Sequence, residues 1–344
     1  MNSRELVRAA LRGEKTPRPA CGPLAVHFCA HHAGATMRAY TTDAKRLADS
    51  VIAYWETFRP DAIWVSSDTW VTAEAMGAPV AFVNDDTPLS GVGLPAIRTA
   101  ADLDALPPPD PWQQGRQPLM LDALRKVRET VGDEAFVVAC FDQSPFSLAC
   151  AVAGLENVMV AAVTEPEFVN ALLDRCTEYT VAYARAMAEC DPDMLSTGDS
   201  PAIMLGPERY RDIALPYEQR VLRSLHEATD CPLSLHICGD TTAFLPGMVR
   251  SGADVLEVDH GVDLTRACAV VPDPIALWGN LDPVGVLCDG TADDVKAACE
   301  SAMDTVRSAG RNRFVLSSGC TLASDTPADN VRALVNSVHN ARWA

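Results

Sequence analysis

The chain has 344 residues, of which 48% are hydrophobic and 22% charged, and its formal net charge is −18. A phosphate backbone or an anionic membrane surface would repel so acidic a protein, which argues against nucleic acid and membranes as partners. The composition is that of a folded protein with a large apolar core, not of a disordered chain.

The N-terminal stretch MNSRELVRAALRGEKTPRP has the pattern of an amphipathic helix and a polar turn, without the apolar run of a signal peptide. No stretch reaches the roughly 18 consecutive apolar residues of a membrane-spanning helix. The 12 cysteines are scattered along the chain, unlike a dense disulfide framework. We therefore expect a cytoplasmic protein with reduced thiols.

Three strands are predicted in the first half of the chain, at residues 23–28, 62–67 and 135–141. Amphipathic helices are expected near 43–58 and 117–131. The Pro-rich tract 93–112 is interpreted as an insertion or loop and not as a domain linker. Residues 144–190 are expected to form two or three helices, more than one crossover between strands requires.

From about residue 190 onward, short apolar runs alternate with amphipathic segments, the pattern of a parallel sheet with crossover helices. Five strands are predicted here, at residues 193–199, 232–238, 255–260, 275–282 and 313–320. Helices are expected over residues 207–229, 263–270, 291–309 and 328–342, with a further short helix that ends at Gly252.

The predicted strands together make the eight of a (β/α)8 TIM barrel, a fold that occupies about 250 residues or more. We predict a single barrel domain over residues 1–344, with an extra N-terminal helix and extra helices that cover the mouth. An open, doubly wound sheet is the competing architecture.

Polar residues close several of the predicted strands, and the active site of a TIM barrel lies at the C-terminal ends of its strands. These residues are Ser66, Ser67, Asp68, Asp199, Ser200, His236, Cys238, Asp240, Glu257, Asp259, His260, Asn280, Asp282 and Cys320. Carboxylates, imidazoles and thiols from neighbouring strands are thus expected at one rim.

The side chains of a strand alternate between its two faces, so His236 and Cys238 share one face while leucine and isoleucine occupy the other. The polar face is therefore predicted to line the barrel lumen. The same parity directs Glu257 and Asp259 inward. His236 and Cys238 can then reach a single metal ion, with Cys320 arriving from the last strand.

One nitrogen and two sulfurs favour tetrahedral Zn²⁺, and three protein ligands with an open fourth position describe a catalytic site. Glu257 is the candidate for a displaceable fourth ligand, and Asp259 is its rival. The alternative interpretation makes Cys238 an ordinary buried thiol and His236 a lumen histidine bonded to Asp240 or Asp259. The H-x-C spacing alone does not decide between the two.

Several motifs resemble the uroporphyrinogen decarboxylase superfamily: HICGDTT (236–242), GADVLEVDHGVDL (252–264), GNLDP (279–283) and LSSGCTLASDTPADNVRALV (316–335). The opening ELVRAALRGEKTPRPACGPL and the segment RPDAIWVSSDTW resemble it too, so the likeness covers nearly the whole chain. The H-x-C pair and the late G-C pair resemble the branch of cobalamin-dependent methyltransferases typified by methylcobamide:coenzyme M methyltransferase.

The resemblance implies a uroporphyrinogen decarboxylase-like barrel in which His236, Cys238 and Cys320 bind zinc. It implies methyl transfer between a corrinoid (methylcobalamin), presented by a separate carrier protein, and a thiol, tetrahydrofolate or a methylated compound, in a direction left open. Asp68 is expected to contact the substrate or the corrinoid. Further residues are expected to orient the ligands or the substrate, namely Asp199, Asp240, Asp259 and Asn280.

A metal-free lyase of the uroporphyrinogen decarboxylase type is the alternative function. A substrate with many carboxylates needs cationic partners, and the region expected to supply arginines offers only Arg38 in ATMRAY. The methyltransferase is therefore favoured. A barrel that docks a corrinoid protein without activity is a third possibility, against which the retention of all three candidate ligands argues.

Overall fold

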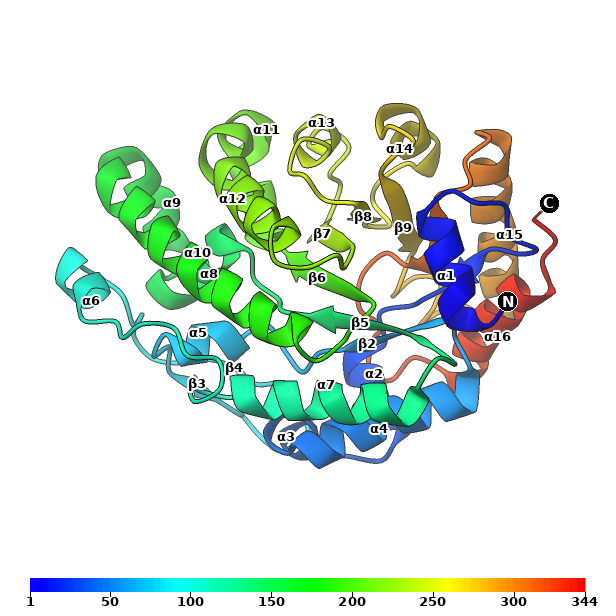
Figure 1. Cartoon of the computed structure of the whole chain (residues 1–344), viewed down its shortest axis with the longest axis horizontal. Helices are drawn as coiled ribbons and strands as arrows, with labels where there is room; N and C mark the ends of the chain where they lie inside the picture. Colours follow the sequence, from blue (N-terminus) through cyan, green and yellow to red (C-terminus); the bar gives the residue numbers. More distant parts are fainter. Residues whose placement is uncertain (344) are drawn as a thin grey trace.

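Parallel strands form an 8-stranded sheet that curls into a nearly closed barrel, in the order β1-β10-β9-β8-β7-β6-β5-β2 (Figure 1). This computed structural model describes residues 1–343. The barrel strands are β1 (Ala20–Cys21), β2 (Ala62–Val65), β5 (Phe136–Cys140), β6 (Met194–Gly198), β7 (Leu233–Ile237), β8 (Val255–Val258), β9 (Ala276–Leu281) and β10 (Phe314–Ser318). The predicted (β/α)8 TIM barrel is confirmed.

Helices cover the outside of the barrel, with α4 and α7 side by side on one flank and α8 to α10 packed together on another (Figure 1). The helices of the first half are α1 (Ser3–Leu11), α2 (Val26–His32), α3 (Met37–Thr42), α4 (Ala44–Phe58), α5 (Val71–Ala75), α6 (Ala100–Asp104), α7 (Gln117–Val131), α8 (Pro145–Ala153), α9 (Leu155–Thr164) and α10 (Pro166–Ala188). Those of the second half are α11 (Gly206–Arg209), α12 (Leu215–His226), α13 (Leu245–Met248), α14 (Leu264–Val270), α15 (Ala292–Ser308) and α16 (Ala328–Asn340).

A 3-10 helix over Ser200–Leu205 and a π-helical turn over Tyr210–Ala214 link β6 to α12. Within the described residues, no single helix is long and apolar enough to cross a membrane; the pair α8 and α9, bent by 108°, passes that test together by length and composition only. All 12 cysteines are free thiols, as expected.

The seam of the barrel lies between β1 and β2, where Asp61 completes the hydrogen bonding. Its N–H donates to the Cys21 carbonyl at 2.9 Å, and the Cys21 N–H donates to its carboxylate at 3.0 Å. Arg18 pairs with both oxygens of this carboxylate, each at 2.7 Å. The buried carboxylate of Asp61 thus accepts the hydrogen bond of the Cys21 N–H at the seam, where β1 has no neighbouring strand to accept it.

Bulky apolar side chains fill the lumen at the end where the strands begin, and these are Trp64, Phe136, Val138, Met194, Val255, Trp278 and Val315. The extra N-terminal helix α1 closes this floor, because its Leu6, Val7, Ala10 and Leu11 belong to the same cluster. The lumen is therefore closed at the floor, and its polar side chains lie toward the opposite end, where the strands finish.

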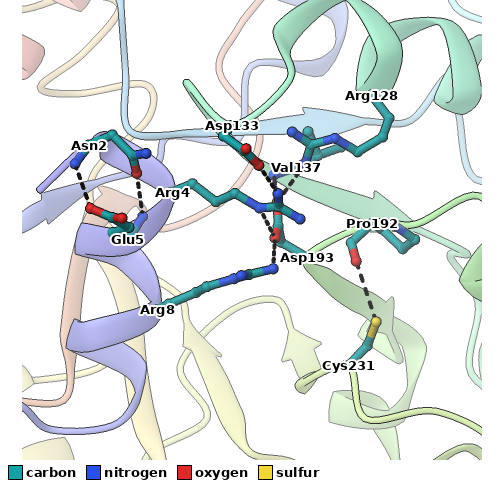
Figure 2. A network of polar contacts seen from close by, with 10 residues as sticks. All are labelled: Asn2, Arg4, Glu5, Arg8, Arg128, Asp133, Val137, Pro192, Asp193 and Cys231. Carbon is teal, nitrogen blue, oxygen red and sulfur yellow. Dashed lines mark hydrogen bonds and ion pairs between the residues drawn. The ribbon is translucent and has the colours of Figure 1, made fainter.

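A charged network fastens α1 to the floor (Figure 2). The carboxylate of Asp193, whose side chain is 0% exposed, accepts hydrogen bonds from Arg4 at 2.6 Å, from Arg8 at 2.7 Å and from Arg128 of α7 at 2.8 Å. The backbone N–H of Val137 donates to the same carboxylate at 3.0 Å. One buried charge therefore connects α1, α7 and two neighbouring strands.

The prediction of a strand over residues 23–28 is wrong. Strand β1 comprises only Ala20 and Cys21, and the apolar run that follows enters α2, where Phe28 packs in the outer core. A short apolar run fits a buried helix as well as a strand, so periodicity cannot separate them. Each of the other barrel strands lies within its predicted range, and α6 is the helix of the Pro-rich tract. The hairpin of β3 (Val80–Ala81) and β4 (Ser90–Gly91) was not predicted.

Candidate metal centre

Three side chains converge at the mouth of the barrel: His236 from β7, Cys238 just beyond β7, and Cys320 just beyond β10. Their ligand atoms all lie within 4.8 Å of one another. His236 Nε2 is 3.0 Å from Cys238 Sγ, and the two sulfurs are 3.6 Å apart. The parity of β7 thus places His236 and Cys238 together, and the end of β10 adds Cys320.

Gly319 allows Cys320 to lie beside Cys238 and His236. A Cβ at this position would lie 2.3 Å from the backbone nitrogen of His260 and 3.0 Å from the carbonyl carbon of Asp259, so the two chain segments are in direct backbone contact. The Gly319 N–H also donates to the Leu281 carbonyl at 2.7 Å. The end of β10 is thereby held against the loop after β8, which places Cys320 beside Cys238.

The hydrogen bonding of His236 selects the nitrogen that can bind a metal. Its Nδ1 lies 3.0 Å from the backbone carbonyl oxygen of Glu257, which can only accept, so Nδ1 carries the proton. In the neutral ring the lone pair is then on Nε2, which faces the sulfurs. A carbonyl or carboxylate on the second ring nitrogen is the usual support of a metal-binding histidine.

The two thiols are not equivalent. A hydrogen bond with Cys320 lowers the pKa of Cys238; burial opposes this, and the Ser200 hydroxyl, which donates to Cys238 Sγ at 3.0 Å, lowers it further. The same sulfur–sulfur hydrogen bond, together with burial, raises the pKa of Cys320 to about 12. Cys238 is therefore the first thiol to ionise. Burial lowers the pKa of His236, but Cys320 and Glu257 raise it, to about 9 overall.

This donor set fits zinc. Zn–S bonds of about 2.3 Å in a tetrahedron place two sulfurs about 3.8 Å apart, and the observed separation is 3.6 Å. Imidazole and thiolate ligands suit zinc better than hard, oxygen-preferring cations. Both cysteines are partly exposed, so the group can be reached from the mouth.

Glu257 and Asp259 lie near this group but do not belong to it. The Glu257 carboxylate is buried deeper in the lumen, where Oε1 accepts hydrogen bonds from Ser196, at 2.7 Å, and from Ser234. Asp259 accepts from the Gly261 N–H at 2.9 Å and pairs with the imidazole of His260. Neither predicted fourth ligand has its carboxylate among the clustered atoms.

Asn280 and Asp240 lie in the loops around the centre. The side-chain amide of Asn280 donates to the carbonyls of Asp259, at 3.1 Å, and Val262, at 2.8 Å, so it fixes the loop after β8. Asp240 is exposed and accepts from the Thr242 N–H at 3.0 Å. Neither makes a hydrogen bond to the three metal-binding candidates.

Asp199 is fully buried behind the centre. Its N–H donates to the His236 carbonyl at 2.8 Å, and its Oδ1 accepts from the N–H and the hydroxyl of Ser147, each at 2.7 Å. Burial raises its pKa to about 6, and the neighbouring Glu218 carboxyl is close enough to share a hydrogen bond with it. Tyr210 donates to the other side of Glu218 at 2.7 Å.

Asp68 is held by an arginine that the sequence did not associate with it. Arg116 binds its two oxygens at 2.5 and 3.0 Å and also contacts Glu74 at 2.6 Å. The Trp70 N–H donates to the same carboxylate at 2.8 Å. Arg38 is the one arginine in the region where a decarboxylase is expected to bind its substrate carboxylates. It pairs instead with Asp85, at 2.5 Å, on the surface.

A cavity of about 530 Å³ adjoins the centre, and Ser200 belongs to its wall. Asp142 and Gln143 also line it, directly after β5. The sequence analysis did not predict this pair, although the polar residues 142–144 directly follow the third predicted strand.

Comparison with known proteins adds two sets of relatives. The family model "Uroporphyrinogen decarboxylase (URO-D)" matches residues 2–341. The chain is 34% identical to a uroporphyrinogen decarboxylase of Crocosphaera subtropica over 285 residues, which cover 81% of this chain and 77% of that one. It is 33% identical to the methylcobamide:CoM methyltransferase MtbA of Methanosarcina mazei over 303 residues, 88% of this chain and 86% of that one.

Among solved structures, a methyltransferase from Methanosarcina mazei superposes with a TM-score of 0.88 at 24% identity and covers 98% of each chain. This likeness supports the fold. Sequence identity to the decarboxylase and to the methyltransferase is almost equal, so the chemistry of the site has to separate the two functions.

Proposed function

The chain belongs to the uroporphyrinogen decarboxylase (URO-D) family, and from this premise we propose that it is a zinc-dependent corrinoid methyltransferase. It would move a methyl group between a corrinoid on a carrier protein and a small thiol, tetrahydrofolate or methylated compound. The observation that carries the proposal is the convergence of His236, Cys238 and Cys320 within 4.8 Å. The likeness to MtbA from two Methanosarcina species supports the same branch of the family.

His236, Cys238 and Cys320 would hold the ion. When bound, zinc supplies a Lewis acid that lowers the pKa of an incoming thiol or water, and the corrinoid supplies or accepts the methyl group. The Glu257 carbonyl keeps the proton on Nδ1 of His236. The hydroxyl of Ser200 donates to Cys238 Sγ and lowers the pKa of this thiol.

The remaining predicted residues are positioning residues in this proposal. Asp199 ties β6 to His236 through its backbone, and Asn280 holds the loop that carries Asp259. Asp68, engaged by Arg116, holds the backbone of Trp70 at the edge of the cavity. The fourth coordination position would be left to the substrate, because the carboxylates of Glu257 and Asp259 are not among the clustered ligand atoms.

A carrier protein would dock at the mouth. Large apolar side chains are exposed on several segments that follow strands, with exposed fractions of 71% at Leu94, 58% at Met204 and 56% at Val284. Exposed apolar groups around a functional opening are typical of protein contact sites. Met204→Asp is expected to slow methyl exchange with the carrier protein and to leave exchange with free methylcobalamin unchanged.

Decarboxylation of a polycarboxylate fits the site less well. The cavity beside the centre has no lysine, arginine or histidine in its wall, and Arg116 is already paired with two carboxylates. Bound carboxylates need cationic or N–H partners. The metal-free lyase therefore lacks the cationic groups that its substrate requires.

The proposal is tested by metal analysis combined with methyl transfer. We expect about one zinc per chain and zinc-dependent demethylation of methylcobalamin in the presence of 2-mercaptoethanol, followed by visible absorbance. The double variant Cys238→Ser, Cys320→Ser is expected to lose both, whereas Cys288→Ser, which alters a thiol outside the group, keeps both. Retention of zinc by the double variant would contradict the proposal.

A further inference from the structure

The cavity beside the metal centre lies between the β3–β4 hairpin, α8 and the ends of β5 and β6, and its volume is about 530 Å³. Ser200 lines it and donates a hydrogen bond to Cys238 at 3.0 Å, so the cavity and the centre share a wall. The size suits a small molecule rather than a macrocycle.

The wall of this cavity is acidic. Asp142 is its only ionisable carboxylate or amine, since lysine, arginine, histidine and further acidic residues are absent from the lining residues. Asp142 forms no ion pair among the described residues. Its Oδ1 accepts a hydrogen bond from the Gln143 N–H at 2.8 Å. The same oxygen lies close to Gly198, since a Cβ on that glycine would be 3.1 Å from it. The carboxylate in the wall thus has no ion-pair partner, and the positive charge that acts on it, on His236, belongs to the metal centre and not to the cavity lining.

Two further features mark this part of the wall. Gln143 adopts a left-handed backbone conformation with a φ of 75°, which costs a non-glycine residue free energy and is typical of functional positions. The residue is 7% exposed, and its amide oxygen accepts no hydrogen bond within the described chain. Asp142 therefore gives the wall a negative charge, and the amide oxygen of the neighbouring Gln143 is a buried acceptor without a partner. Trp70 adds an indole ring to the same wall.

We propose that the cavity binds a small methylated organic cation of the ammonium or sulfonium type as the methyl donor or acceptor. The inference rests on the methyltransferase function proposed above and names its substrate class. The carboxylate of Asp142 would pair with the positive charge, and the indole of Trp70 would stabilise it through a cation–π interaction. A sulfonate or carboxylate would meet Asp142 with no cationic side chain among the cavity-lining residues. The net charge of −18 also attracts cations toward the mouth.

Calorimetric titration of the zinc-loaded protein tests this directly. Tetramethylammonium is expected to bind, and methanesulfonate and the uncharged tert-butanol at least tenfold more weakly. Asp142→Asn keeps the size of the side chain and is expected to weaken tetramethylammonium binding tenfold to a hundredfold. Asp289→Asn removes an exposed charge outside the cavity wall and is the matched control, with binding unchanged.

A second variant guards against a folding defect at Asp142. Val92 lines the cavity and is 44% exposed, so Val92→Arg adds a cation without disturbing the core and is expected to weaken tetramethylammonium binding at least tenfold. Equal binding of tert-butanol, tighter binding of methanesulfonate, or unchanged binding in both variants would overturn the inference. Any of these three results, with zinc still bound, would contradict the inference about the substrate and not the methyltransferase proposal. A protein that binds tetramethylammonium but no zinc would contradict the methyltransferase proposal.

Discussion

At the scale of single residues, the centre depends on which side chains carry protons. Cys238 is the more acidic thiol, because Cys320 and Ser200 donate to it, and the Glu257 carbonyl directs the lone pair of His236 toward the sulfurs. Strand parity was enough to predict that His236 and Cys238 lie on one face, toward the lumen. It could not predict that Arg116, from the segment before α7, neutralises Asp68, because nothing local in the sequence links the two.

The buried pair of Asp199 and Glu218 gives a prediction for stability. Burial raises the folded-state pKa of Asp199 from its ordinary value to about 6, so its contribution to stability is present at low pH and is lost as the pH rises through about 6. Asn does not titrate. Asp199→Asn is therefore expected to gain about 1 kcal/mol relative to wild type between pH 5 and pH 7, measured by urea unfolding. If the free energy of unfolding of Asp199→Asn fell relative to wild type from pH 5 to pH 7, the raised pKa of Asp199 would be contradicted.

At the scale of elements, helix amphipathicity was the most reliable signal: α4 and α7 lie within or match the ranges predicted for them. Strand β1 was misplaced because only two of its residues pair with β10, too few to leave an alternating pattern. Strand ends supplied the metal-binding candidates because parallel strands of a barrel finish at one rim. The cavity wall was not predicted, since it also needs the β3–β4 hairpin and α8 to come together in space.

The close approach of β10 to the loop after β8 gives a prediction at this scale. Gly319→Ala would place a Cβ 2.3 Å from the His260 nitrogen, so the end of β10 must shift and carry Cys320 away. We expect zinc affinity to fall at least tenfold in chelator competition, while the circular dichroism spectrum stays that of the wild type.

Gly290→Ala is the matched control. Its Cβ would also meet backbone, the Val286 carbonyl oxygen at 2.4 Å, but before α15 and away from the three metal-binding candidates. An equal loss of zinc affinity in both variants would show that Gly319 has no specific part in placing Cys320.

At the scale of the whole molecule, stability and chemistry lie at opposite ends of the barrel. The floor is closed by α1 with an apolar cluster and the Asp193 network (Figure 2), whereas the three metal-binding candidates lie at the mouth. This division is typical of TIM barrels. It predicts that the two ends can be altered independently.

Asp193→Asn tests this separation. Removal of a buried charge that faces three guanidinium groups leaves them uncompensated and is expected to lower the free energy of unfolding by about 3–5 kcal/mol, with zinc content unchanged. Asp133→Asn, which alters the 77% exposed partner of Arg4, is expected to cost at most about 1 kcal/mol. Denaturant unfolding compares the two, and loss of zinc at a retained fold would contradict the independence of floor and mouth.

The most direct measurement of the central claim is X-ray absorption at the zinc edge of the purified protein. Coordination by His236, Cys238 and Cys320 predicts a first shell with two sulfur ligands at about 2.3 Å and at least one nitrogen at about 2.0–2.1 Å. One sulfur should disappear in Cys320→Ser. A first shell of oxygen and nitrogen alone, or a spectrum unchanged by that substitution, would contradict the account.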